Sequence, residues 1–188
     1  MPEQFIIYAC PVGELADQLG RYFTASLNAC GRNAAHDYMP HCSLTGFFWD
    51  EPGAVGMYRE AIAKALTAQL AIAPNPLITI KAMTFHPDWH GLELQSDWLP
   101  LLMAQVAQFA ISPTRTAPLR FKTWLHLSLA YEFLPEHAQA LKQLAQAHIN
   151  LQSTVDWELR FYQRHPDHQW TCHQSWPLPT NSALLNSP

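Results

Sequence analysis

Apolar residues along the chain follow two periods, which predict strands and helices in succession. Continuous or alternating apolar runs predict strands at 5–9, 77–85, 90–95, 155–162 and 169–176. Apolar positions spaced three and four residues apart predict helices at 14–30, 54–71, 98–109 and 135–148. The mixture of long helices with strands grouped in hairpins favours an α+β fold.

Breaking residues mark the ends of several of these elements. Pro11 is predicted to close the first strand, and Gly31 to end the first helix. Asp97 is a candidate N-cap for the helix that follows it. We find no linker that would separate two domains, so residues 1–178 are expected to form one domain, followed by a loose tail at 179–188 rich in Pro, Ser and Asn.

One motif, His-x-Ser-Leu-x-x-x-Phe, occurs twice: once from His41 to Phe48 and again from His126 to Phe133. Because side chains at i and i+2 on a strand lie on the same face, each copy presents a His beside a Ser hydroxyl. A helical segment follows each copy. A single copy is most often a core strand with a hydrogen-bonded His, but a second copy in an equivalent position favours a functional pair. The doubled order predicts two similar lobes whose motifs face each other across a central cleft.

Two His and two Ser side chains in one cleft suit acid–base chemistry on a phosphate. The ordinary pKa of His, about 6.5, allows His41 and His126 to divide the work, one accepting a proton from water and the other donating one to a leaving alkoxide. The hydroxyls of Ser43 and Ser128 can donate to the non-bridging phosphoryl oxygens, where negative charge develops. This scheme needs no metal ion.

Further side chains on or near the motif strands are candidate substrate contacts. Thr45 continues the row of His41 and Ser43, and Lys122 and Trp124 precede His126 at the same spacing. Lys122 can hold a phosphate and Trp124 can stack on a base. Tyr8 of the first strand is a candidate for lining the cleft, although packing is the commoner role of a strand Tyr.

The amino-acid composition restricts the kinds of partner that this chain is expected to bind. The 188 residues have a formal net charge of −4 and no run of Lys or Arg, so a long nucleic acid held by its backbone is not expected. The chain has no apolar stretch long enough to span a membrane and no signal-peptide pattern, and we expect a cytoplasmic protein with reduced cysteines. Cys42 lies between the motif residues but points to the opposite face, so we interpret it as core. The oligomeric state cannot be predicted.

The C-terminal His and Cys residues leave a metal-based alternative open. They are His165, His168, Cys172 and His173. Their spacing matches no common zinc pattern, and we interpret them as residues of a hairpin and its turn.

The paired motifs His41-Cys-Ser43 and His126-Leu-Ser128 resemble the two His-x-Ser/Thr motifs of the 2H phosphoesterase superfamily, which includes RNA 2′,3′-cyclic phosphodiesterases of the LigT kind. The resemblance covers most of the chain. It implies a bilobal α+β fold with two pseudo-symmetric lobes of antiparallel sheet, helices packed outside and a central cleft. It also implies metal-independent opening of a 2′,3′-cyclic phosphate or related nucleotide or RNA-end phosphodiester, without a cofactor. His41 and His126 would then be acid and base, and Ser43 and Ser128 would bind phosphate. The alternative is a non-catalytic nucleotide- or phosphate-binding module on the same fold.

Overall fold

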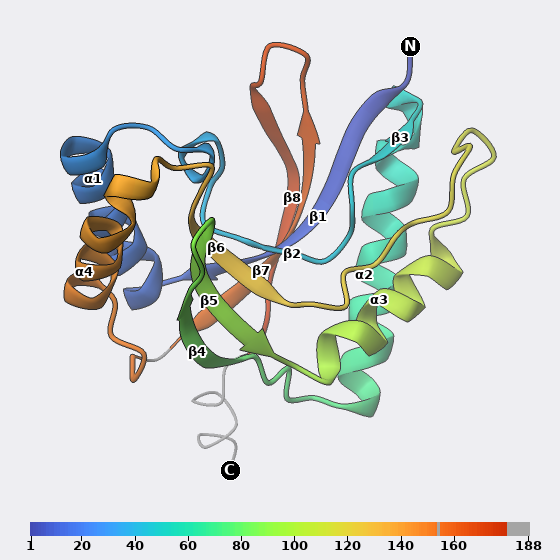
Figure 1. Cartoon of the computed structure of the whole chain (residues 1–188). Coiled ribbons are helices and arrows are strands. Elements are labelled where there is room, and N and C mark those ends of the chain that lie inside the picture. Colours follow the sequence, from blue (N-terminus) through green and yellow to red (C-terminus); the bar gives the residue numbers. More distant parts are fainter. Residues whose placement is uncertain (154, 180–188) are drawn as a thin grey trace.

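The computed structural model describes residues 1–153 and 155–179, which fold around one eight-stranded sheet (Figure 1). The strands follow the order β4-β5-β6-β2-β1-β7-β8, with β3 also paired to β1, and the paired strands are antiparallel. Their bounds are β1 (Glu3–Val12), β2 (Cys42–Ser43), β3 (Phe48–Asp50), β4 (Thr79–Phe85), β5 (Trp89–Gln95), β6 (His126–Tyr131), β7 (Asp156–Arg164) and β8 (Trp170–Pro177). The expected α+β class is confirmed.

Four helices pack in two pairs, one on either side of the middle of the sheet in Figure 1. One pair is α1 (Glu14–Cys30) with α4 (Ala138–His148), and the other is α2 (Val55–Ile72) with α3 (Trp98–Phe109). Short 3₁₀ turns η1 (Ala34–Asp37), η2 (Pro52–Ala54) and η3 (Pro135–His137) join them to the strands. This arrangement is consistent with the expected bilobal architecture.

Strand alternation divides the sheet into a core face and a cavity face. In β1, Ile7 and Ala9 point into the large hydrophobic core beneath the helices, whereas Ile6 and Tyr8 belong to a smaller cluster on the other face. Because the period of a strand is two, the same alternation in β2 and β6 sends their apolar residues to the core and their His and Ser residues to the cavity face.

The predicted helices are confirmed, with small differences at their ends. Gly31 terminates α1 as expected, with φ of 75° and its N–H donating to the carbonyl of Leu27. Asp97 occupies the N-cap position of α3 as predicted, but its side chain makes no capping bond; Ser96 Oγ instead accepts a hydrogen bond from the N–H of Leu99, at 3.2 Å.

The observed ends of the strands differ more from the predicted ends than those of the helices do. Pro11 does not close β1, which continues to Val12 with Pro11 opposite Trp157. On its other side β1 pairs with β2 only at Tyr8 and Ala9, so the missing N–H of Pro11 breaks no ladder there. The two motif strands differ in length, since β2 has two residues and β6 runs from His126 to Tyr131; upstream of β6, Phe121 forms a single bridge to Thr45.

Two further expectations concern the C-terminal tail and membrane-spanning segments. The predicted loose tail lies outside the described residues apart from Pro179. Within residues 1–153 and 155–179, no helix has the length and apolar character to cross a membrane.

Candidate active site

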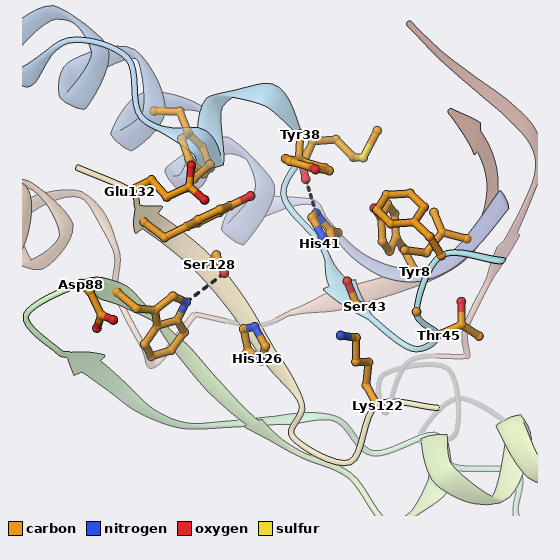
Figure 2. Close-up of a pocket in the computed structure, with 18 residues that line it drawn as sticks. Tyr8, Tyr38, His41, Ser43, Thr45, Asp88, Lys122, His126, Ser128 and Glu132 are labelled. Atoms are coloured by element: carbon orange, nitrogen blue, oxygen red, sulfur yellow. Dashed lines mark hydrogen bonds between the residues drawn. The ribbon is translucent and has the colours of Figure 1, made fainter. Parts of the chain in front are cut away.

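A cavity of about 540 Å³ opens on the face of the sheet where β2 and β6 lie side by side. Its walls include both His and both Ser side chains of the repeated motif. Figure 2 shows His41, Ser43, His126 and Ser128 around a common space. The structure therefore brings together four side chains that the sequence places far apart.

The register between the two motif strands explains how these side chains meet. Cys42 of β2 is paired with Leu127 of β6, and both side chains are fully buried in the core. Since the strands are antiparallel, the flanking residues fall opposite one another: His41 beside Ser128, and Ser43 beside His126. Each imidazole thus faces the hydroxyl of the other copy, an arrangement with approximate twofold symmetry.

Both imidazoles are oriented by the same kind of hydrogen bond. Nδ1 of His41 lies 2.7 Å from the carbonyl of Met39, and Nδ1 of His126 lies 3.2 Å from the carbonyl of Trp124, in each case two residues upstream. A carbonyl oxygen only accepts, so Nδ1 carries a proton in both rings. Nε2 is left to exchange a proton with a ligand.

The two rings differ in their electrostatic surroundings. Burial lowers the pKa of His41 to about 4, against the opposing effect of the hydrogen bond to the Met39 carbonyl, and His126 lowers it further. Burial also lowers the pKa of His126, where the Trp124 carbonyl and Glu93 oppose the shift and Lys122 adds to it. Both imidazoles are accordingly neutral near pH 7 in the unliganded protein.

An aromatic ring covers each histidine. Tyr8, which is buried, lies 3.9 Å from the ring centre of His41, and Trp124 stacks on His126 at the same centroid distance. Tyr8 lines the cavity, as expected of a candidate contact. Trp124 is half exposed and is not among the residues that line the cavity; its position covers His126.

Thr45 and Lys122 also line the cavity, in different ways. The hydroxyl of Thr45 is fully buried and accepts a hydrogen bond from the backbone N–H of Ile7 at 3.1 Å, so it joins the loop after β2 to β1. Lys122 is exposed and its backbone N–H donates to the carbonyl of Leu44, which holds it beside the first motif. It is the one Lys or Arg among the described lining residues.

Several further residues that line the cavity are not marked by the fixed positions of the repeated motif. They are Tyr38, Asp88, Trp89, Tyr131 and Glu132. Trp89, which immediately precedes the predicted strand 90–95, is the first residue of β5, and its indole N–H donates to Ser128 Oγ at 2.9 Å, a bond drawn as a dashed line in Figure 2. No local pattern in the sequence marks Trp89, because its contact with Ser128 depends on the pairing of β5 with β6.

Two of these further residues are carboxylates. Asp88 and Glu132 lie at the end of the cavity farther from Lys122 (Figure 2), and Glu132 has a φ of 55°, a left-handed conformation uncommon for a residue with a side chain. The charged side chains that line the cavity are those of Asp88, Glu132 and Lys122, and together they carry one net negative charge. A cavity with this charge suits a small ligand of low charge better than a polyanion.

The C-terminal histidines and cysteine do not gather around a common point. His165 bonds to Thr171 and His173 bonds to Gln163, each through Nε2 at 2.8 Å. Across residues 1–153 and 155–179 there is no group of three or more His, Cys, Asp or Glu side chains placed to hold a metal ion. The hairpin interpretation of this segment is confirmed, with β7 and β8 on either side of the turn.

Comparison with known proteins finds relatives with longer chains. The chain is 31% identical over 169 residues to ubiquitin-associated and SH3 domain-containing protein B of Mus musculus, which covers 87% of this chain and 26% of that protein. It is 30% identical over 199 residues to ecdysteroid-phosphate phosphatase of Drosophila melanogaster, covering 88% and 26%, and 26% identical over 168 residues to the Bombyx mori protein of that name, covering 88% and 25%. No protein-family model matches the chain.

The chain therefore spans about a quarter of the length of the curated relatives that it matches. Two of these relatives are named phosphatases, which gives coarse support to a phosphoesterase-like protein. The name describes the whole relative and does not locate its activity in the matching quarter.

Proposed function

We propose that this chain is a phosphoesterase of the two-histidine type that opens a 2′,3′-cyclic phosphate or a related nucleotide or RNA-end phosphodiester. The observation that carries the proposal is the register of β2 and β6, which sets each imidazole beside the hydroxyl of the other motif copy. Two proton-transfer groups and two hydrogen-bond donors around one space are what in-line displacement at phosphorus requires. The phosphatase names of two relatives support the broader class.

In this mechanism one imidazole accepts a proton from water through Nε2 as the water oxygen attacks phosphorus. The bond from phosphorus to one ribose oxygen breaks, and the other imidazole donates a proton from its Nε2 to that oxygen. The product is a phosphate monoester with a free neighbouring hydroxyl. Ser43 and Ser128 donate to the two non-bridging oxygens, whose charge increases in the transition state. A second turnover needs only the transfer of one proton between the histidines through solvent.

The dimensions and charge of the cavity favour a small substrate. A volume of about 540 Å³ lies within the range of small-molecule sites and accommodates a mononucleotide. Lys122 supplies a cation for the phosphate, and the surrounding aromatic rings supply faces for a base. No basic groove for a long nucleic acid accompanies them among the described lining residues.

A second candidate, a non-catalytic phosphate- or nucleotide-binding module, is favoured by one observation. Both histidines have pKa values below the ordinary one, so neither carries the acid proton at neutral pH in the free protein. A module of this kind retains ligand affinity through Ser43, Ser128 and Lys122. It has no turnover to lose when a histidine is replaced.

The test is turnover of the four nucleoside 2′,3′-cyclic phosphates by the purified chain, with EDTA present throughout. We expect hydrolysis in the parent and a loss of at least about a hundredfold in His41→Ala and in His126→Ala, because each removes one proton-transfer group. His148→Ala is the matched control, since this His ends α4 outside the cavity, and it should retain parental activity.

The outcomes separate the two candidates. Turnover lost in both single variants and kept in the control supports the two-histidine enzyme. Binding of a nucleoside monophosphate without turnover of any of the four substrates supports the binding module. Activity of the parent that is found only in a parallel assay without EDTA overturns the metal-independent mechanism.

A further inference from the structure

The two phosphate-facing hydroxyls are held differently, although their motifs match. Ser128 Oγ accepts a hydrogen bond from Nε1 of Trp89 at 2.9 Å, whereas Ser43 Oγ has no such partner among the described residues. Trp89 also contacts the imidazole of His126 edge to face, with ring centres 5.4 Å apart. One indole therefore touches both residues of the second motif.

The position of this indole depends on a glycine in the same strand. Gly91 is paired with Ser128 across β5 and β6, and Trp89 lies two residues before it on the same face. A Cβ atom built on Gly91 would lie 2.2 Å from Cζ2 of Trp89, so the indole occupies the space that any other residue would fill. The missing side chain lets the ring lie back along the strand and reach Ser128.

Hydrogen-bond chemistry gives this contact a direction. An indole N–H only donates, so the hydroxyl oxygen of Ser128 must use a lone pair to accept it. The hydroxyl proton is then turned away from Trp89, and no other side chain bonded to Ser128 Oγ is found in the described part of the chain. With the oxygen on the cavity wall, that proton is available to a group inside the cavity, which is water in the free protein and a ligand when one is bound.

We propose that Trp89 is a positioning residue that orients the Ser128 hydroxyl as a preorganised donor to the substrate phosphate, and that Gly91 gives it the room to do so. The proposal rests on the proposed phosphoesterase function for its kinetic consequence. It makes the second motif the rigid half of the phosphate site, and leaves Ser43 as the adaptable donor. Preorganised donors contribute to catalysis because they do not have to reorient as charge develops.

The kinetic test is a double-mutant cycle in the cyclic-phosphate assay. Trp89→Phe keeps a large aromatic ring but removes the N–H, and we expect kcat to fall about tenfold with KM changed much less, because the donor is disordered rather than lost. Ser128→Ala should lower kcat about a hundredfold. In the Ser128→Ala background, Trp89→Phe should cause less than about a twofold further loss, because both changes remove the same interaction.

Trp98→Phe provides the matched control. Its indole N–H also makes a hydrogen bond, to the carbonyl of Ala73 at 2.8 Å, and it is buried away from the cavity. Retained kcat in this variant shows that losing an indole hydrogen bond is not in itself inhibitory. Independent effects of Trp89→Phe and Ser128→Ala, multiplying to about a thousandfold, would overturn the proposal and make Trp89 a separate substrate or packing contact.

A ligand-free measurement separates this inference from the proposed function. The indole N–H signal of Trp89, assigned by its absence in Trp89→Phe, should move in the ¹H–¹⁵N spectrum of Ser128→Ala, while the Trp98 signal stays in place. An unmoved Trp89 signal would refute the contact whether or not the chain turns over a cyclic phosphate. A moved signal in a chain without turnover would keep the orienting contact and reject the enzyme.

Discussion

His41 and His126 occupy equivalent positions in the repeated motif but have different surroundings. His41 lies deeper, against buried Tyr8, and its pKa falls to about 4; His126 lies beside half-exposed Trp124, and its pKa is lowered with Glu93 opposing the shift. Charge on His126 also lowers the pKa of His41. The group that holds its proton less strongly is suited to be the base, so the free protein favours His41 as base and His126 as acid.

This difference predicts an acid-shifted pH profile for hydrolysis of a cyclic phosphate. Activity requires His41 without its proton, which develops as the pH rises through about 4, and His126 with its proton, which is lost as the pH rises through a pKa below 6.5. Because kcat/KM reports ionisations of the free enzyme, its maximum should lie between these two values. The two histidines interact, so the limbs describe the pair rather than each residue alone.

Initial rates at low substrate concentration from pH 3.5 to 8.5 measure this profile. Glu93→Gln is an informative variant, because Glu93 favours the charged form of His126. It should move the falling limb to lower pH and leave the rising limb nearly in place. A plateau extending through pH 8 would contradict the assignment of a histidine with a lowered pKa as the acid.

The chemical residues were predictable from the sequence because they repeat, whereas their supports were not. His41, Ser43, His126 and Ser128 are marked by a pattern that occurs twice. Trp89 has no repeat, and its role depends on an indole that lies over Gly91 of its own strand to reach Ser128 on the neighbouring strand, which is a property of the pairing of β5 with β6. A contact of this kind is set by the register, and no local pattern specifies the register between distant segments.

Among the elements, β2 is notable because two residues position one entire motif. Its short ladder is extended by the loop that follows it, where the hydroxyl of Thr45 accepts from the N–H of Ile7 in β1 and the N–H of Leu44 donates to the Ile7 carbonyl. A bridge from Thr45 to Phe121 then joins this loop to the segment before β6. Thr45 thus serves as part of the sheet, whatever further contact it makes with a ligand.

Replacing Thr45 by Val tests this structural role. The change keeps the shape of the side chain but leaves the buried N–H of Ile7 without its acceptor, so we expect a loss of about 1–3 kcal/mol in the free energy of unfolding. Thr45→Ser retains the hydroxyl and should lose less than Val does. Urea denaturation of the three proteins measures the difference, and a Val variant as stable as the parent would show that the bond contributes nothing.

Helices were easier to predict than strands for a physical reason that these elements illustrate. The apolar face of α1 repeats over 17 residues, so its limits are fixed by many positions and by Gly31. The motif strands have few residues each, and their ends depend on which neighbour continues the ladder. Pro11 shows the same dependence, because a residue that normally stops a strand is accommodated where β1 has a partner on one side only.

At the scale of the whole molecule, the cavity imposes a cost on the folded state in acid. The fold keeps His41 deep enough that its pKa falls from 6.5 to about 4. In the unfolded chain the same residue takes a proton near pH 6.5. Below that pH the unfolded state therefore binds more protons than the folded state, and stability decreases as the pH falls from about 6.5 to about 4.

We therefore expect His41→Gln to lose less stability in acid than the parent does. The shift of His41 corresponds to about 3 kcal/mol of unfolding free energy lost between pH 7 and pH 4, and the Gln variant lacks this contribution. Other histidines with lowered pKa values, His90, His126 and His173, leave part of the acid dependence in place. Urea denaturation at pH 7 and pH 4 gives the difference for each protein. The matched control is His137→Gln, which lies outside the cavity and should behave as the parent. If His41→Gln loses as much stability in acid as the control does, the pKa of His41 in the folded state lies near its ordinary value of 6.5. The assignment of His41 as the base would then lose its support. A greater loss in His41→Gln than in the control would mean that the folded state raises the pKa of His41, and the order of acid and base in the proposed reaction would be reversed.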